Sequence, residues 1–176
     1  MKNLLVLAGG SPRNRAWGEA CKEFFKSGYD ATFFIQYSHW DNGGSNLDFK
    51  VELEKIAETI KNADSEAEWY VLAKSVGSIL TLKAVHAGIM NPVKCVFFGM
   101  PFSVFPENIY EDTLSSFSVP TLAFHTDNDP TANYEIAKEK ITKYLQTITF
   151  KTLSGNTHDY LDFGEYEDEI KVFLNS

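Results

Sequence analysis

Positive charge is scarce in this sequence. Its 176 residues include 16 Lys and Arg against 24 Asp and Glu, which gives a formal net charge of −8 at pH 7. The basic residues are also scattered, whereas a surface that binds a polyanion needs them clustered. We therefore expect no nucleic-acid partner.

Cysteines and long apolar runs are few as well. Cys21 and Cys95 are the only cysteines and form no C-x-x-C motif, so we expect two reduced, buried thiols in a cytoplasmic protein. No stretch approaches the roughly 20 apolar residues that cross a bilayer, so no membrane association is expected. The apolar run at residues 4–8 is too short for a signal peptide, and we interpret it as a buried first strand.

Linkers, repeats and low-complexity tracts are also missing from the sequence. Hydrophobic residues make up 44% and charged residues 23%, as in ordinary globular proteins. A chain of this length can form one domain with a substantial core. We therefore predict a single domain over residues 1–176 without a cap domain, as a monomer or a small homo-oligomer.

The chain alternates short apolar runs with amphipathic stretches. The runs are rich in Val, Phe, Leu and Ile, which is typical of strands buried on both faces of a parallel sheet. Strands are predicted at 3–8, 31–36, 69–73, 94–99, 119–125 and 147–153, and helices at 14–27, 49–62, 76–88, 107–115, 131–145 and 159–174. This alternation predicts an α/β fold with a three-layer, doubly wound, mostly parallel six-stranded sheet. In such folds the site lies at the carboxyl ends of the strands.

The loop after the third predicted strand contains a candidate nucleophile. The sequence AKSVGS, residues 73–78, is a relaxed form of G-x-S-x-G, with small residues two positions before and after Ser75. A tight strand-to-helix turn of this kind exposes the serine hydroxyl above the sheet. The alternative is that Ser75 only caps the following helix, which serine does well.

Two later loops supply an acid and a base. HTDNDP, residues 125–130, follows the fifth strand and contains Asp127 and Asp129, of which one could simply form a turn. GNTHDY, residues 155–160, follows the sixth strand and contains His158. The order Ser75, Asp, His158 is the order of an α/β-hydrolase triad.

With these three motifs, the chain resembles small, lidless members of the α/β-hydrolase superfamily, nearest to the dienelactone-hydrolase-like group with a K-S-x-G elbow. The resemblance extends over nearly the whole chain and implies a truncated, six-stranded sheet of order 2-1-3-4-5-6. The acid loop of that family commonly reads H-G-x-x-D-P. Aligned with it, HTDNDP places Thr126 on the glycine and Asp129 on the acid.

The resemblance implies a serine hydrolase that needs no cofactor and no metal. Ser75 would attack the acyl carbonyl of a small substrate, His158 would act as the base and Asp129 would orient it. The oxyanion would accept hydrogen bonds from the N–H groups of Val76 and Gly10, with Gly9 and Ser11 close to the second donor.

Several other side chains are candidates near this site. A pocket could be lined by Ser11, Trp17 and Trp40, together with Tyr37 and His39. We expect this pocket to be shallow, which favours small or protruding esters. His125 is expected to be packed, and Lys74 could pair with an acid rather than take part in catalysis.

Two alternatives remain at this point. The opening sequence GGSPRNRAWGEA, residues 9–20, could cradle the phosphate of FMN in a flavodoxin-like reductase, because backbone N–H groups also bind phosphate. The imperfect elbow is compatible with an inactive hydrolase fold that serves as an interaction module.

Overall fold

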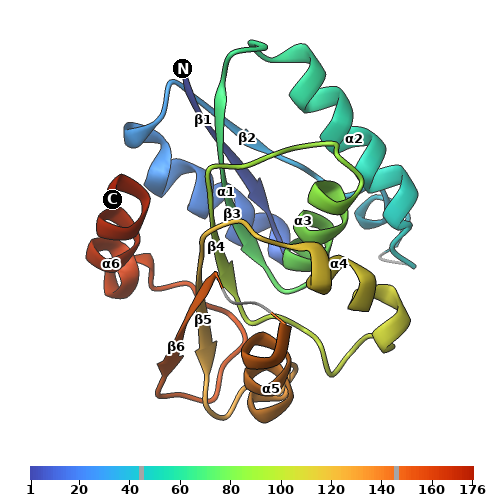
Figure 1. Ribbon diagram of the computed structural model, residues 1–176, viewed down its shortest axis with the longest axis vertical. Helices are drawn as coiled ribbons and strands as arrows, with labels where there is room; N and C mark the ends of the chain where they lie inside the picture. The colour runs from blue at the N-terminus through green and yellow to red at the C-terminus, as the bar shows by residue number, and fades with distance from the viewer. Residues whose placement is uncertain (44–45, 145–146) are drawn as a thin grey trace.

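The six strands form one parallel sheet of order β2-β1-β3-β4-β5-β6 (Figure 1). The structure is a computed structural model that describes residues 1–43, 46–144 and 147–176. The strands are β1 (Lys2–Leu7), β2 (Ala31–Phe34), β3 (Glu68–Lys74), β4 (Lys94–Phe98), β5 (Thr121–Thr126) and β6 (Ile148–Leu153). The predicted fold class and strand order are confirmed, and every strand pair is parallel.

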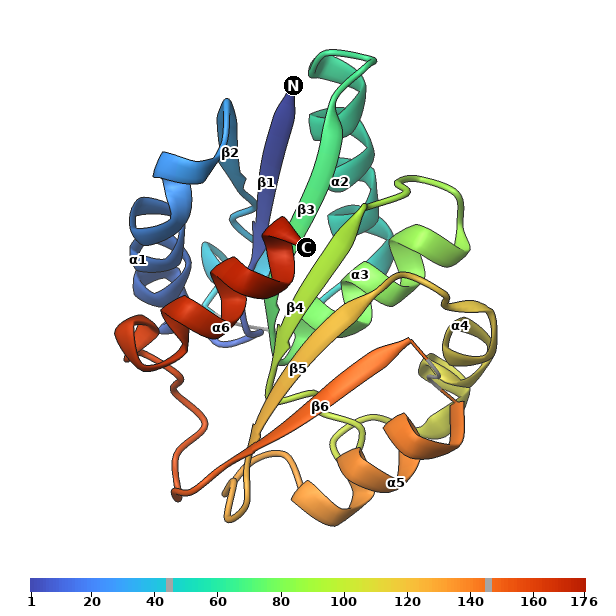
Figure 2. The same cartoon turned by 60° about the vertical axis from the view of Figure 1, so that its left-hand side comes forward.

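Helices cover both faces of the sheet. Helices α1 and α6 lie on one face, and α2, α3, α4 and α5 lie on the other (Figure 2). Their bounds are α1 (Asn14–Phe25), α2 (Phe49–Asn62), α3 (Val76–His86), α4 (Glu111–Ser116), α5 (Tyr134–Tyr144) and α6 (Phe163–Asn175). Short 3₁₀ turns occur at Lys26–Gly28, Ser38–Trp40 and Glu107–Ile109. This is the predicted three-layer arrangement.

Burial follows the position of each strand in the sheet. All six residues of β5, and all but the first of β1, β3 and β4, are buried or nearly so, because both faces of these strands are covered. The edge strands β2 and β6 are only partly buried. Helix α3 packs between the sheet and helices α2 and α4, which explains why its sequence is apolar on nearly all sides.

Two predicted helices begin too early. Residues 159–162 are not helical, because Tyr160 adopts a backbone φ of 50° and α6 begins only at Phe163. The helix predicted from residue 131 begins at Tyr134, because the Asp129 side chain accepts the N–H groups of residues 131 and 132. Its predicted end at residue 145 lies outside the described residues.

The described helices include none that is long and apolar enough to span a membrane. Cys21 and Cys95 are both buried and form no disulfide in the described part of the chain.

Candidate active site

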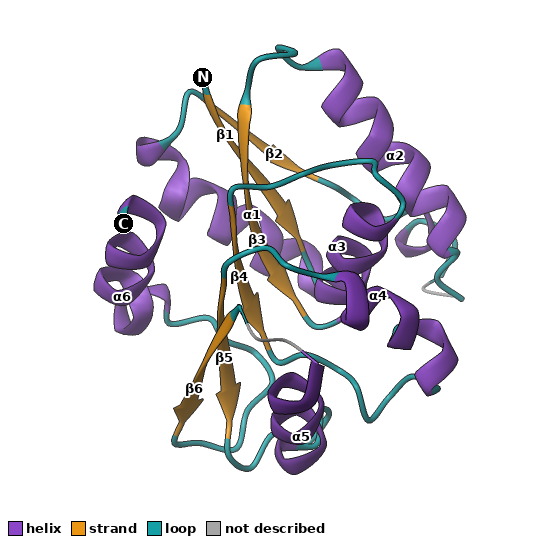
Figure 3. Cartoon of the chain, in the orientation of Figure 1, coloured by secondary structure: helices purple, strands orange, loops and turns teal. Residues whose placement is uncertain are grey.

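The loops that follow β1, β3, β4, β5 and β6 gather at the carboxyl edge of the sheet (Figure 3). Ser75 lies there, directly between the last residue of β3 and the first residue of α3. Its φ of 51° and ψ of −122° are unusual for a residue with a side chain, and such strain is found at functional turns. Its hydroxyl makes no capping hydrogen bond to α3, so a cap does not account for this serine.

Small residues around Ser75 let the strand and helix approach closely. Gly77 is required for this contact, because a Cβ added there would lie 2.2 Å from the carbonyl oxygen of Leu7. Ala73, at the other small position, is completely buried. The turn therefore places the N-terminus of α3 directly against the end of β1.

Asp129 and His158 form a hydrogen-bonded pair next to this turn. The Nδ1 of His158 lies 2.7 Å from Oδ2 of Asp129, whose side chain has no exposed surface. Since an ionised carboxylate only accepts hydrogen bonds, the imidazole must carry its proton on Nδ1. This leaves Nε2 with a free lone pair, which is the tautomer that a general base needs.

Asp129 is fixed by several further donors. Its Oδ1 accepts the N–H groups of Thr131 and Ala132 at 2.8 Å each, and its Oδ2 accepts the hydroxyl of Tyr160 at 2.9 Å. Burial by itself would raise the pKa of Asp129, but the hydrogen bonds from His158, Ala132 and Thr131 outweigh it and lower the pKa to about 2. The carboxylate is therefore ionised at neutral pH.

The neighbouring Asp127 has a different environment. It is exposed, and its Oδ1 accepts hydrogen bonds from Gly155 N–H at 3.1 Å and from the Asn128 side chain at 2.9 Å. It thus closes a turn between the β5 and β6 loops, while Asp129 contacts the histidine. His125 is packed, as expected: its Nε2 donates to the carbonyl of Ala132 at 2.9 Å, and burial lowers its pKa.

The end of β4 brings the serine turn and the histidine loop together. Ser75 donates its backbone N–H to the carbonyl of Phe98 at 2.8 Å. The next residue, Gly99, has a φ of 56°, and a Cβ built there would lie 2.8 Å from Cε1 of His158. Ser75 therefore contacts Phe98 and His158 contacts Gly99, so the two residues lie beside consecutive positions of the chain. In the described part of the chain the buried Nε2 of His158 has no hydrogen-bond partner, so no hydrogen bond yet joins it to Ser75.

Gly10 and Val76 lie next to each other. A Cβ added to Gly10 would lie 3.5 Å from Cγ1 of Val76. Val76 is the first residue of α3, so its N–H has no partner within the helix. Two backbone segments that can donate hydrogen bonds therefore meet beside Ser75.

Side chains from the segment after β2 hold the Gly10 loop in place. Trp40 donates its indole N–H to the carbonyl of Gly10 at 2.8 Å, and Nε2 of His39 donates to the same oxygen at 2.6 Å. Tyr37 donates its hydroxyl to the carbonyl of Ala8 at 2.8 Å. We call Tyr37, His39 and Trp40 the loop clamp. Trp40, predicted to line a pocket, is instead buried in this clamp.

The loop clamp is fastened in turn to α2. Glu52 is almost completely buried, and its Oε1 accepts the N–H of Ser38 at 2.7 Å. Lys55 lies 3.3 Å from the other carboxylate oxygen of Glu52 and donates to the carbonyl of Gln36. The position of the Gly10 loop thus depends on Glu52 and Lys55 of α2.

A cavity of about 350 Å³ opens beside His158. Its lining includes Ser11 and Trp17, together with Lys74 and Asp159. Trp17 is mostly buried, and its indole N–H donates to the carbonyl of Tyr160 at 2.9 Å. It therefore serves both as a wall of the cavity and as a support for the histidine loop.

Sequence reasoning missed several residues that shape the site. Gly99 and Tyr160 act through contacts with loops far away in sequence, and the same holds for Thr126, whose hydroxyl donates to the carbonyl of Thr157 at 2.6 Å. The only sequence pattern that could have indicated Gly99 is a glycine at the end of an apolar run. No sequence pattern indicated Tyr160, two positions after His158.

The described residues contain no group of three or more His, Cys, Asp or Glu side chains placed to hold a metal ion. No protein-family model matches the sequence, and no curated protein matches it significantly.

Many solved structures share this fold. A lidless α/β serine hydrolase from Xanthomonas campestris has a TM-score of 0.74 at 14% identity, and the match covers 99% of this chain and 81% of that one. An esterase from Pyrococcus furiosus has a TM-score of 0.74 at 12% identity, covering 99% and 80% of the two chains. An esterase from Exiguobacterium antarcticum has a TM-score of 0.71 at 14% identity, covering 100% and 92%. The chain has the fold of the lidless α/β-hydrolases.

Proposed function

We propose that this protein is a serine hydrolase that cleaves an ester or related acyl bond of a small substrate through an acyl-enzyme. Ser75 is the nucleophile, His158 the general base and Asp129 the residue that orients the histidine. The observation that carries the proposal is the hydrogen bond between Asp129 and Nδ1 of His158, which leaves a buried and unpartnered Nε2 beside a strained serine turn.

The reaction follows from this arrangement. Ser75 Oγ attacks the acyl carbonyl while its proton passes to Nε2 of His158. The imidazolium then protonates the leaving alcohol, and the acyl group stays on the serine as an ester. A water molecule, deprotonated by the same nitrogen, attacks this ester and releases the acid. Asp129 stays ionised throughout and stabilises the imidazolium.

The negative oxygen of each tetrahedral intermediate needs preorganised donors. The N–H of Val76 and an N–H of the Gly10 loop serve this purpose in the proposal, because the two segments meet beside Ser75. Each such donor is typically worth about 3 kcal/mol in the barrier. The nearby cavity has room for a small acyl or alcohol group.

A fluorophosphonate probe tests the nucleophile directly. We expect the wild-type protein to be labelled covalently and Ser75→Ala to remain unlabelled, with peptide mass spectrometry locating the adduct on Ser75. Ser78→Ala is a matched control, since this serine lies one helical turn away and its hydroxyl only bonds the carbonyl of Ser75. Its labelling should persist.

Three outcomes would contradict the proposal. Labelling of Ser75→Ala would place the nucleophile elsewhere. A wild-type protein that is neither labelled nor able to hydrolyse para-nitrophenyl acetate would favour an inactive interaction module. Flavin absorbance in the purified protein would favour the flavodoxin-like alternative.

A further inference from the structure

Lys74 is a buried lysine that the proposed reaction does not use. It directly precedes Ser75, and only 3% of its surface is exposed. Its Nζ donates to Oδ1 of Asn14 at 2.7 Å and lies 5.8 Å from the centre of the Trp17 ring. The pairing with an acid that the sequence left open is absent: no carboxylate in the described part of the chain lies within ion-pair distance of Nζ.

A buried ammonium group without a counter-ion is unusual. Transfer of a charged group into a protein interior is costly, and buried lysines are almost always paired with a carboxylate. Asn14 supplies one neutral acceptor to a group with three N–H donors. Consistent with this shortage, burial lowers the pKa of Lys74 to about 8, although Asp159 and Asp129 oppose the shift. The charge of Lys74 is therefore only partly compensated by the protein.

The uncompensated charge faces the cavity beside the catalytic histidine. Lys74 and His158 line the same cavity of about 350 Å³, so a molecule placed there can reach both. The remaining charged groups in the lining are Arg13 and Asp159, which are both exposed and have opposite signs. The buried part of the cavity thus has a positive charge and an aromatic wall, with no acid in contact with the lysine.

We propose that Lys74 binds a carboxylate group of the substrate, so that the enzyme selects esters whose acyl or alcohol part is anionic. This inference rests on the proposed serine hydrolase function. A carboxylate in the cavity completes the hydrogen bonds of the ammonium group and supplies its missing counter-ion. The cavity is small, which restricts the substrate to short chains between the carboxylate and the scissile ester.

Matched pairs of esters test this selectivity. The acyl pair is the methylumbelliferyl ester of hexanoic acid and the monomethylumbelliferyl ester of adipic acid, which have equal carbon numbers. The alcohol pair is para-propylphenyl acetate and its analogue with a carboxylate at the end of the propyl chain. We expect the wild-type enzyme to prefer the anionic member of one pair by about 10- to 100-fold in kcat/KM, as for a charge-assisted hydrogen bond. The pair that shows the preference identifies the side of the ester that Lys74 recognises.

Substitution of the lysine should remove the preference. In Lys74→Met, which keeps an unbranched side chain one atom shorter and without charge, the ratio of the two kcat/KM values should fall to about 1 or below. Lys74→Gln, which keeps a neutral N–H donor on the side of Asn14, provides a second variant if the first does not fold. Lys83→Met is the control, because Lys83 also lies over an aromatic ring but is only half-buried and lies on α3, outside the lining of the cavity. Its ratio should equal that of the wild type.

A binding measurement separates this inference from the proposed function. Adipate should bind to Ser75→Ala at least tenfold more tightly than to the Ser75→Ala, Lys74→Met double variant in calorimetry, whether or not the wild type hydrolyses esters. Equal affinities, or a wild-type enzyme that shows no preference in either ester pair, would overturn the role of Lys74. Absence of any Ser75-dependent hydrolysis together with lysine-dependent adipate binding would overturn only the hydrolase function.

Discussion

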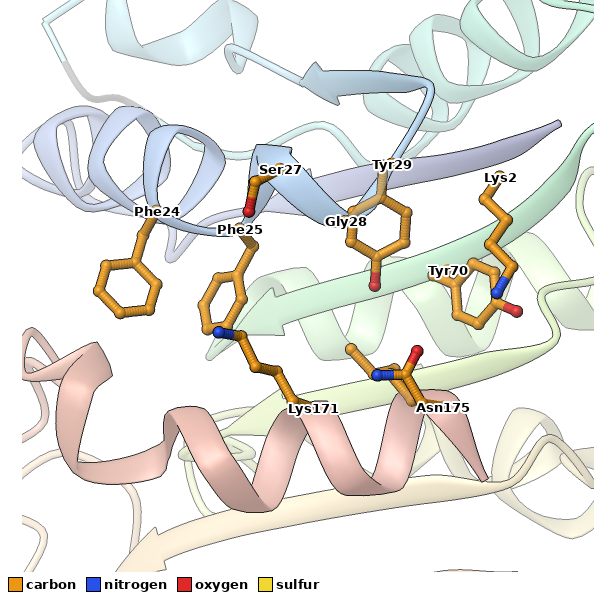
Figure 4. Close-up of a pocket in the computed structure, with 10 residues that line it drawn as sticks. Lys2, Phe24, Phe25, Ser27, Gly28, Tyr29, Tyr70, Lys171 and Asn175 are labelled. Atoms are coloured by element: carbon orange, nitrogen blue, oxygen red, sulfur yellow. The ribbon is translucent and has the colours of Figure 1, made fainter.

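Two cavities at opposite ends of the sheet both place a lysine over an aromatic ring. At the amino edge, Lys2 lies 5.8 Å from the ring of Tyr70, and residues of α1 and α6 complete a cavity of about 120 Å³ (Figure 4). At the carboxyl edge, Lys74 lies 5.8 Å from the ring of Trp17 in the cavity beside His158. The two cation–aromatic contacts have the same length, but their surroundings differ.

The lysines of the two cavities differ in their exposure to water and in whether a carboxylate pairs with them. Lys2 is exposed, and the second lysine of the amino-edge cavity, Lys171, is exposed and paired with Glu167. Lys74 is buried and has no carboxylate partner in the described chain. An exposed lysine keeps its hydration and has no need of a ligand, whereas the buried one has lost most of its water. We therefore assign function to the carboxyl-edge cavity and packing to the other.

The largest expected effect concerns the acid next to His158. Asp129→Asn should lower kcat by about 10⁴-fold, because the amide favours the wrong imidazole tautomer. Asp127→Asn, in the same loop, should stay within about threefold of the wild type, because Asp127 is exposed and bonds only a surface turn, and the new amide keeps an oxygen that still accepts those N–H groups. Steady-state kinetics with para-nitrophenyl acetate measure both. The assignment of the acid is wrong if the two variants exchange their behaviour.

The next prediction compares the kcat of two glycine variants, one at each end of the sheet. Gly99→Ala forces a Cβ to within 2.8 Å of the His158 ring at a φ of 56°, so we expect kcat to fall by about 100-fold through displacement of the base. Gly28→Ala, in the amino-edge cavity, should leave kcat unchanged because a Cβ there meets no atom within 4 Å. Equal losses of activity would remove the functional distinction between the two cavities.

The loop clamp should have a smaller effect on catalysis. Trp40→Phe keeps an aromatic side chain but removes the indole N–H and its hydrogen bond to the Gly10 carbonyl, and we expect kcat to fall by about tenfold with KM little changed. The rate for a thionoester, whose sulfur fits an oxyanion hole poorly, should fall less on this substitution than the rate for the corresponding oxygen ester. Tyr70→Phe in the amino-edge cavity is the control and should leave both rates unchanged. A change in KM alone would assign Trp40 to substrate binding.

The last effect is on stability rather than on activity, and it is an expected gain. Lys74→Met should stabilise the protein by about 3 kcal/mol at pH 7, because burial lowers the pKa of Lys74 from 10.5 to about 8 and the charged form is disfavoured in the folded state. Below pH 8 Lys74 is charged in both states, and the wild type bears the full free-energy cost of burying that charge. The cost disappears between pH 8 and 10.5, where the unfolded chain binds more protons than the folded one. Urea unfolding of the wild type, Lys74→Met and Lys2→Met across this range measures the effect. Lys2→Met should follow the wild type; destabilisation of Lys74→Met at pH 7 would show that the lysine is structural.

The sequence allowed the fold and the centre of the site to be predicted, because both depend on local patterns. Strands buried on both faces appear as continuous apolar runs, and the small residues around Ser75 mark a tight turn. Once the sheet is assumed to be parallel, the loops that contain Asp129 and His158 must meet at one edge. These inferences required no knowledge of individual contacts.

The supporting contacts could not be predicted, since each joins distant segments. The bond of Trp40 to the Gly10 carbonyl spans 30 residues, and that of Tyr160 to Asp129 spans 31. Nothing local distinguishes a tryptophan that clamps a loop from one that lines a pocket. The start of α6 was misplaced for a related reason, because the long-range bonds of Tyr160 hold it at a φ of 50° and override the local helical pattern.

The bond from Trp17 to the carbonyl of Tyr160 has a consequence for the order in which the site is assembled. It spans 143 residues, so the histidine loop gains its support from α1 only after nearly the entire chain has been synthesised. Ribosomes add residues from the N-terminus, and contacts of large sequence separation form late in folding. A chain truncated before residue 158 would therefore lack both the histidine of the candidate site and the support that Trp17 gives to its loop.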